Sequence, residues 1–295
     1  MTVFASPMGL LIIGFALVVG GSSLFTHSLE STVARFFENR NRGLRILANL
    51  SLSLPELVLP LIAFLTPRAP TTRIEAGTGA LFGSPLFLSL FLIPLSLFLA
   101  PPQGRTLFRE IPLLILALGG AMALTGHPFW IRLLLAAGLC GLYLWGLGSM
   151  EEAEEKTPDP SAPWRWTDGL FLAAGAGLMG IGSHLFLDGI DHLPEVLLLT
   201  PFWVALLLAP IATEAPELLT LTHFLRKREL APTFSVLWGS IHLQSTLGIA
   251  IGLVASPWGA SRETLHAGGA LLSVLAFLFL VGVFRGRTGG GKARP

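Results

Sequence analysis

The segment "PIATEAPELLTLTHF" (210–224) decides the fold, because it places two acids and two prolines inside a long apolar run. The run "LLLTPFWVALLLA" precedes it and the basic run "RKREL" follows it. Pro216 lacks a backbone N–H and clashes with the carbonyl four residues earlier, so we expect the helix to kink or break just before Glu217. Backbone carbonyls that lose their helical hydrogen bonds at the proline would then lie next to the Glu217 carboxylate, inside an apolar helix.

The composition indicates that this helix lies in a membrane. Apolar residues make up 52% of the 295 residues and charged residues only 13%, while the mean hydropathy is +0.70. These values exclude a water-soluble globule and predict an all-α polytopic membrane protein, with the lipid bilayer as its surroundings. The single cysteine, Cys140, excludes an intramolecular disulfide and a cysteine metal site. The net charge of +1 gives no sign of a nucleic-acid partner, and none is expected.

Nine apolar stretches are long enough to cross a bilayer, at about 17–25 residues each. No positively charged residue precedes the first apolar stretch, so we interpret it as a span and not as a cleaved signal peptide. Sorting the 19 basic residues by alternate sides puts 15 on one side and 4 on the other. The richer side is expected to be cytoplasmic, which places the N-terminus outside the cell membrane and the C-terminus inside. The predicted spans are 7–34, 44–66, 75–99, 109–126, 129–148, 166–190, 194–224, 232–255 and 265–284.

The two halves of the chain resemble one another. A shift of 161 residues aligns "GFALVVGGSSLF" (14–25) with "GAGLMGIGSHLF" (175–186), and it also aligns "LPEL" (54–57) with "APEL" (215–218). Each copy comprises about five helices. Because five is an odd number, the second copy enters the membrane from the opposite side, which gives the inverted repeat typical of secondary transporters. We therefore expect four parts. They are a first repeat of about five helices at 1–150, an acidic cytoplasmic linker at 151–163, a second repeat of about four helices at 164–285 and a basic cytoplasmic tail at 286–295.

Polar oxygens accompany the proline-glutamate pair in both copies. Residues three or four apart lie on one helical face, so the acids and hydroxyls of each motif are expected to stack together. A Gly-Ser pair in the next helix of each copy allows close backbone approach and adds a hydroxyl. Oxygen ligands with several carboxylates suit hard cations such as Ca²⁺ or, with weaker coordination, Na⁺. The candidate ligands are Glu56, Glu217, Glu214, Ser53, Thr213, Ser84, Ser240 and Gln244.

These motifs resemble the sodium/calcium exchanger superfamily of cation antiporters. The stretches "SLSLPE" (51–56) and "IATEAPE" (211–217) are similar to the first motif of its two α-repeats. The stretches "GALFGSPLFL" (79–88) and "SVLWGSIHLQ" (235–244) partially match the second motif, and "LFLDGID" (185–191) resembles the segment before the second repeat. The resemblance implies that Glu56 and Glu217 are the central carboxylates of an ion site and that the serines and threonine support them.

The chain also departs from that family pattern. Leu52 and Leu88 stand where the first repeat usually carries a threonine and a polar amide or carboxylate. In the second repeat, Glu214 replaces a usual serine, and Gln244 stands for the usual acid or amide. The family usually has ten helices, whereas nine are predicted here.

Two functions follow from these residues. The first is an antiporter that exchanges Ca²⁺ for Na⁺ or H⁺ by alternating access at a midmembrane carboxylate site, without a cofactor. Three neighbouring carboxylates would leave at least one proton bound in the absence of a divalent ion, which predicts pH-dependent transport. The alternative is a membrane protein that keeps the exchanger fold with a degenerate ion site and serves as a sensor or scaffold. No enzyme is expected, because the chain lacks H-E-x-x-H and an obvious serine–histidine pairing.

Overall fold

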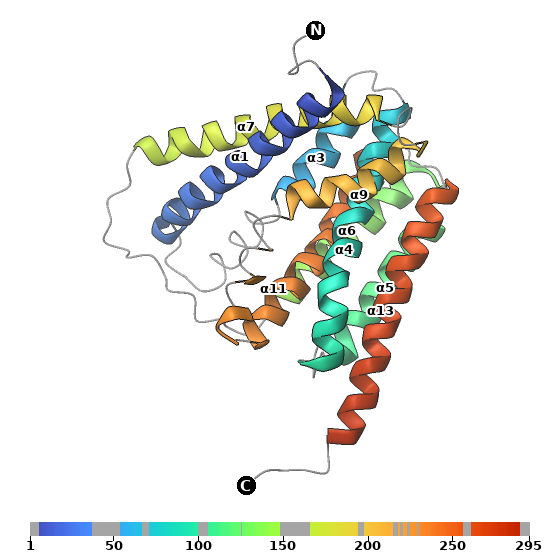
Figure 1. The fold of residues 1–295 in the computed structure, drawn as a ribbon. Helices are drawn as coiled ribbons and strands as arrows, with labels where there is room; N and C mark the ends of the chain where they lie inside the picture. The colour runs from blue at the N-terminus through green and yellow to red at the C-terminus, as the bar shows by residue number, and fades with distance from the viewer. Residues whose placement is uncertain are drawn as a thin grey trace. The chain divides into compact units, whose positions relative to one another are not determined.

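Helices form nearly all of the structure, a computed structural model (Figure 1). The described residues contain no β-strand. They are 6–36, 54–66, 71–99, 106–124, 126–147, 166–193, 198–214, 218, 221–222, 225–228, 230–255 and 261–289.

The helices follow the order of the predicted spans. Within the described residues they amount to nine when η2 is joined to α5 and when α11, η3 and α12 are taken as one continuous helix. Here η2 and η3 are short π-helical segments. The bounds are α1 (Pro7–Phe36), α3 (Leu54–Leu65), α4 (Thr71–Phe98), η2 (Thr106–Glu110), α5 (Ile111–Ala123), α6 (Phe129–Leu147), α7 (Trp166–His192), α9 (Pro201–Thr213), α11 (Leu230–Leu243), η3 (Gln244–Gly248), α12 (Ile249–Ala255) and α13 (Arg262–Gly289).

Six helices in the described part of the chain are long and apolar enough to cross a membrane, which confirms the multi-pass prediction. They are α1, α4, α6, α7, the continuous α11–α12 segment and α13. In contrast, α9 has 13 residues and is shorter than the span predicted at 194–224. The described part of the span predicted at 44–66 begins at Leu54, where α3 starts. A span needs about 20 residues, and α9 ends within one turn of Pro216, where the proline predicts an interruption.

The chain forms two compact units, and each draws on both halves of the sequence. The first comprises residues 1–84 and 152–219, and the second comprises 85–151 and 220–295. Helix α4 contributes to both, since its residues up to Ser84 belong to the first unit and those from Pro85 belong to the second. The predicted division into 1–150, 151–163, 164–285 and 286–295 describes sequence repeats and stays a prediction.

Glycines hold α1 and α7 in close contact in the first unit (Figure 1). A Cβ added to Gly182 would lie 2.8 Å from the carbonyl oxygen of Gly14, and one added to Gly21 would lie 2.8 Å from that of Gly175. The later residue of α1, Gly21, contacts the earlier residue of α7, Gly175, so the two helices run antiparallel. The shift of 161 residues exchanges Gly14 with Gly175 and Gly21 with Gly182, so equivalent residues make reciprocal contacts, as an inverted repeat requires.

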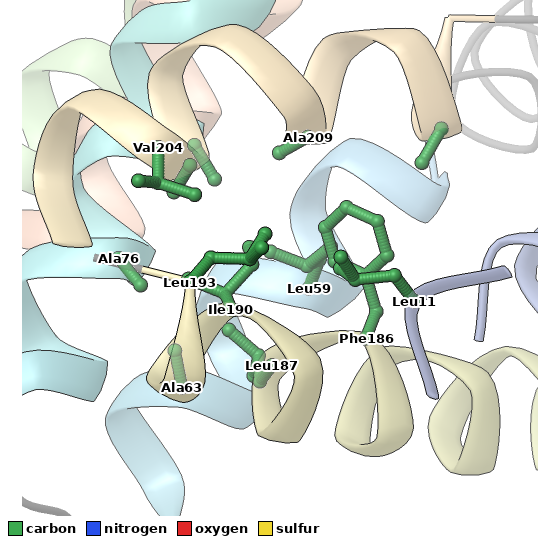
Figure 2. Close-up of a cluster of buried hydrophobic side chains, with 13 residues drawn as sticks. Leu11, Leu59, Ala63, Ala76, Phe186, Leu187, Ile190, Leu193, Val204 and Ala209 are labelled. Atoms are coloured by element: carbon green, nitrogen blue, oxygen red, sulfur yellow. The ribbon is translucent and has the colours of Figure 1, made fainter. Parts of the chain in front are cut away.

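The apolar core of the first unit joins α1, α3, α4, α7 and α9. Small residues such as Ala63 and Ala76 let the helices approach, while Leu59 and Phe186 fill the space between them (Figure 2). Small residues at helix interfaces are typical of membrane proteins, where packing replaces the hydrophobic effect as the force between helices. This core fixes the helices α3 and α9, which carry the candidate site.

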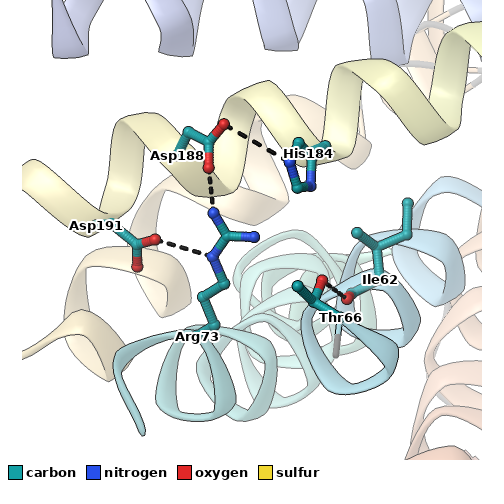
Figure 3. Close-up of polar contacts among 6 residues, drawn as sticks. All are labelled: Ile62, Thr66, Arg73, His184, Asp188 and Asp191. Atoms are coloured by element: carbon teal, nitrogen blue, oxygen red, sulfur yellow. Dashed lines mark hydrogen bonds and ion pairs between the residues drawn. The ribbon is translucent and has the colours of Figure 1, made fainter. Parts of the chain in front are cut away.

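An ion-pair cluster joins the beginning of α4 to the end of α7 (Figure 3). The Arg73 guanidinium pairs with the Asp188 carboxylate and donates from Nε to Asp191 Oδ2 at 2.9 Å. His184 Nε2 lies 3.9 Å from the second oxygen of Asp188. Arg73 is 12% exposed, and both aspartates are partly exposed. At the end of α3 nearby in Figure 3, the Thr66 hydroxyl donates to the Ile62 carbonyl at 2.7 Å.

Substitution of Arg73 by glutamine is expected to destabilise the folded protein by about 1–3 kcal/mol, between the values for exposed and for buried ion pairs. The change leaves two neighbouring aspartates without their shared cation. Arg73→Lys should lie between wild type and Arg73→Gln, since an ammonium lacks the planar fork that reaches both carboxylates. Thermal unfolding in detergent measures the effect. The matched control is Arg262→Gln, an exposed arginine at the start of α13, and an equal loss in both variants would contradict the assignment.

Packing in the second unit pairs α5 with α13 (Figure 1). It also pairs α6 with α12. Arg285 near the end of α13 donates from Nη1 to the backbone carbonyl of Ser96 in α4 at 3.1 Å. This bond links the end of α13 to the end of α4.

Candidate functional site

Glu56 lies in the first turn of α3, directly after Pro55. Proline is well suited to this position, because the first turn of a helix has no intrahelical acceptor for its N–H groups. The Glu56 side chain is 4% exposed. A carboxylate in a lipid-spanning protein is costly to bury and usually serves a function, so Glu56 is the strongest described candidate in the first repeat.

Thr213 and Glu214 lie where α9 ends. Glu214 is the C-cap residue, and its N–H donates to the Pro210 carbonyl at 2.9 Å. Its carbonyl in turn accepts from the Leu218 N–H at 3.0 Å. Thr213 is 1% exposed and Glu214 is fully buried. The helix end therefore presents a hydroxyl and a carboxylate in the interior of the first unit.

Ser84 of α4 meets this helix end. Its Oγ lies 3.4 Å from the Thr213 Oγ1, which also donates to the Ala209 carbonyl at 3.1 Å. The neighbouring Gly83 makes the contact possible, because a Cβ there would lie 2.5 Å from the Leu206 carbonyl oxygen. The Gly-Ser pair thus allows the close approach that the sequence predicts, and it brings Ser84 and Thr213 together.

The other two described candidates lie in the second unit. Ser240 is 8% exposed and Gln244 is 2% exposed. Gln244 opens the π-helical segment η3, in which Ser245 and Thr246 are also fully buried. Single-turn π-helical segments inside α-helices occur frequently at functional sites. The wider turn at Gln244 therefore supports its candidacy independently of the sequence motif.

Two of the candidate ligands, Ser53 and Glu217, lie outside the described residues. Among the residues that the structure describes, no group of three or more His, Cys, Asp or Glu side chains is close enough to hold a metal ion. The part of the predicted site that can be described consists of Glu56, Ser84, Thr213 and Glu214 in the first unit, with Ser240 and Gln244 in the second.

The comparisons with known proteins identify the family of this chain. The sequence model of the family "Sodium/calcium exchanger protein" matches residues 6–148 and 168–291, one segment in each predicted repeat. The chain belongs to the sodium/calcium exchanger family. A search of curated protein sequences gives no significant match.

Solved exchangers share the fold of this family member. The crystal structure of the H⁺/Ca²⁺ exchanger CAX has a TM-score of 0.70 at 19% identity, over 93% of this chain and 80% of that chain. Native YfkE gives 0.65 at 14% identity, over 97% and 89%. The sodium/calcium exchanger from Methanococcus jannaschii gives 0.50 at 19% identity, over 94% and 90%. At such low identities the matches show a shared fold alone.

A third buried acid, Glu110, was not among the predicted site residues of this exchanger-family chain. It is 1% exposed at the end of η2, and its Oε2 accepts from the Trp238 indole N–H at 2.8 Å. The next turn of α11 carries His242, which is fully buried with its ring 6.2 Å from those of Trp238 and Tyr143. Glu110 stands beside Arg109 at the edge of the predicted span 109–126, so its sequence position resembles that of an ordinary interfacial charge.

Proposed function

We propose that this chain is a secondary active antiporter that exchanges Ca²⁺ for Na⁺ or H⁺ by alternating access. The family is one of transporters and not of enzymes, and its fold is that of proteins described as H⁺/Ca²⁺ and sodium/calcium exchangers. The observation that carries the proposal is the burial of Glu56 and Glu214, two carboxylates in one unit of a multi-pass membrane protein. No cofactor is needed for such exchange.

The proposed ion site consists of oxygen ligands from both repeats. Glu56 and Glu217 supply the central carboxylates and Glu214 adds a third. Hydroxyls and one amide complete the coordination, which is the ligand type that Ca²⁺ prefers. The supporting ligands are Ser53, Ser84, Thr213, Ser240 and Gln244.

Calcium flux into liposomes that contain the purified protein tests the function. Uptake is expected when a Na⁺ or H⁺ gradient is imposed, and empty liposomes measure the leak. Comparison of the two gradients identifies the counter-ion. Absence of uptake under both gradients would contradict the proposal.

A second candidate function is a sensor or scaffold that does not transport. Leu88 favours it, since this fully buried apolar residue occupies a position where related exchangers carry a polar ligand. Calcium binding without flux under either gradient would support this candidate and overturn antiport.

Transport is expected to rise with pH between about pH 5 and pH 8, because protons compete with Ca²⁺ for the same buried carboxylates. Lowering the pH protonates these groups and removes the charge that binds the cation. Glu214→Ser should weaken this dependence, since it removes one of three competing carboxyls. Initial rates of calcium uptake at a series of pH values measure it. An unchanged profile in Glu214→Ser would remove Glu214 from the site.

We also propose that the chain lies in the cell membrane with its C-terminus in the cytoplasm. The bias of 15 basic residues against 4 on alternate sides of the predicted spans supports this orientation. A tag at the C-terminus is therefore expected to react with an impermeant reagent only after the cells are opened. Labelling of that tag in intact cells would contradict the nine-helix topology, and a tag at the N-terminus is the matched control.

A further inference from the structure

An apolar groove crosses one side of the second unit, between the second half of α4 and residues 221–237. Its volume is about 330 Å³. Several of its lining side chains are open to the outside, including Leu90 at 65% and Phe98 at 75% exposure. The lining residues that define its course are Leu90, Phe91, Pro94, Phe98, Leu225 and Leu237. In a membrane protein, an exposed apolar groove of this kind is filled by hydrocarbon.

Three cations follow the groove directly in the sequence. Leu225 lines the groove, and the next residues, Arg226, Lys227 and Arg228, are all exposed. None of these three forms an ion pair within the described part of the chain. The backbone of Arg228 is in the left-handed region, with φ of 59°, so the chain turns at the end of this basic run.

A fourth cation lies beside the α4 wall of the groove. The Arg285 guanidinium donates to the carbonyl of Ser96, which stands between the lining residues Pro94 and Phe98 in α4. Cations therefore accompany both chain segments that line the groove, with Arg226 to Arg228 directly after Leu225 and Arg285 at Ser96 of α4. An anionic phospholipid is complementary to this arrangement, since its apolar chain ends in a negatively charged phosphate.

We propose that this groove binds one acyl chain of an anionic phospholipid, with the lipid phosphate held by Arg226 and Lys227. A neutral or zwitterionic lipid would fill the groove but gain less from the basic run, because each Lys or Arg near a surface strengthens anionic-lipid binding about fivefold. A second copy of this chain would bring the same cations to the same place, and their repulsion disfavours that occupant. This site is distinct from the proposed cation site and does not depend on transport.

Native mass spectrometry of the full-length protein in mild detergent tests the proposal. The probes are dioleoyl phosphatidylglycerol and dioleoyl phosphatidylcholine, which share their chains and differ in headgroup charge. Wild type is expected to bind the anionic lipid at least about tenfold more tightly. The double variant Arg226→Gln, Lys227→Gln should weaken this binding about 25-fold, and it should leave binding of the neutral lipid unchanged. Leu90→Trp, which fills the groove, should weaken binding of both lipids.

Matched controls separate the groove from the rest of the lipid-facing surface. Arg262→Gln removes an exposed cation at the opposite end of α13 from Arg285, and Leu116→Trp enlarges a side chain of α5 that is 72% exposed and lies outside the groove. Both controls should bind lipid as wild type does. Equal affinity of wild type for the two lipids, or wild-type affinity in the double variant, would overturn the proposal. If Leu90→Trp fails to fold, the double variant decides, because its two residues are exposed.

Discussion

Glu56→Gln is expected to reduce Ca²⁺ exchange by about 100-fold or more, to the level of empty liposomes. Glutamine has nearly the same shape as glutamate but lacks the charge that neutralises a divalent ion at a buried site. Loss of one partner from a buried charge interaction costs about 3–5 kcal/mol, and about 1.4 kcal/mol corresponds to a tenfold change in affinity. The same reduction is expected for Glu217→Gln, the equivalent residue in the second repeat.

The folded protein should survive both substitutions. A neutral amide is less costly than a carboxylate inside a membrane protein, so the variants should be extracted in detergent with wild-type yield. Glu263→Gln is the matched control, because it makes the same chemical change at the start of α13, outside the proposed site. Calcium uptake under the gradient that drives wild type measures all three. Wild-type flux in Glu56→Gln or Glu217→Gln would remove that residue from the ion site.

The helical architecture could be predicted because lipid imposes a simple rule on the sequence. A span needs about 20 apolar residues in sequence, and long stretches such as 129–148 and 166–190 became α6 and α7 within a few residues. The rule fails for α9, which has 13 residues where a span was predicted at 194–224, since apolar length does not show where a helix ends. Helix α9 ends at Thr213 with Glu214 as its C-cap, a boundary that the apolar run itself does not mark.

Site residues could be predicted from the sequence where the same motif occurs in both repeats. Gly83 and Ser84 could be predicted as site residues because Gly239 and Ser240 repeat them in the second copy, and the structure places Ser84 beside Thr213. The pairing of Arg73 with Asp188 and Asp191 has no such signal. Its partners are more than 100 residues apart in sequence, and no periodic pattern connects them. The π-helical turn at Gln244 also has no signal in the repeat pattern or in the apolar run that contains it.

Gly182→Val is expected to abolish correct packing of α7 on α1 and to destabilise the protein by about 3 kcal/mol or more. The first side-chain carbon alone would lie 2.8 Å from the Gly14 carbonyl oxygen and 2.8 Å from the Val18 nitrogen. Both are backbone atoms and cannot rotate away, so the helices must separate. Separation would also break the neighbouring contact of Gly21 with Gly175. The yield of monodisperse protein and its thermal unfolding in detergent measure the effect.

Gly180→Val provides a control in the same helix, because a Cβ at Gly180 meets nothing within 4 Å. Both variants change helix propensity alike, so the difference between them isolates the contact with α1. The inverted repeat predicts an equal effect at the equivalent glycine of α1. Gly21 is the equivalent of Gly182, and its added Cβ would lie 2.8 Å from both the Gly175 carbonyl oxygen and the Met179 nitrogen. Gly21→Val should therefore cost as much as Gly182→Val, and wild-type stability in either would show that α1 and α7 do not depend on this reciprocal glycine contact.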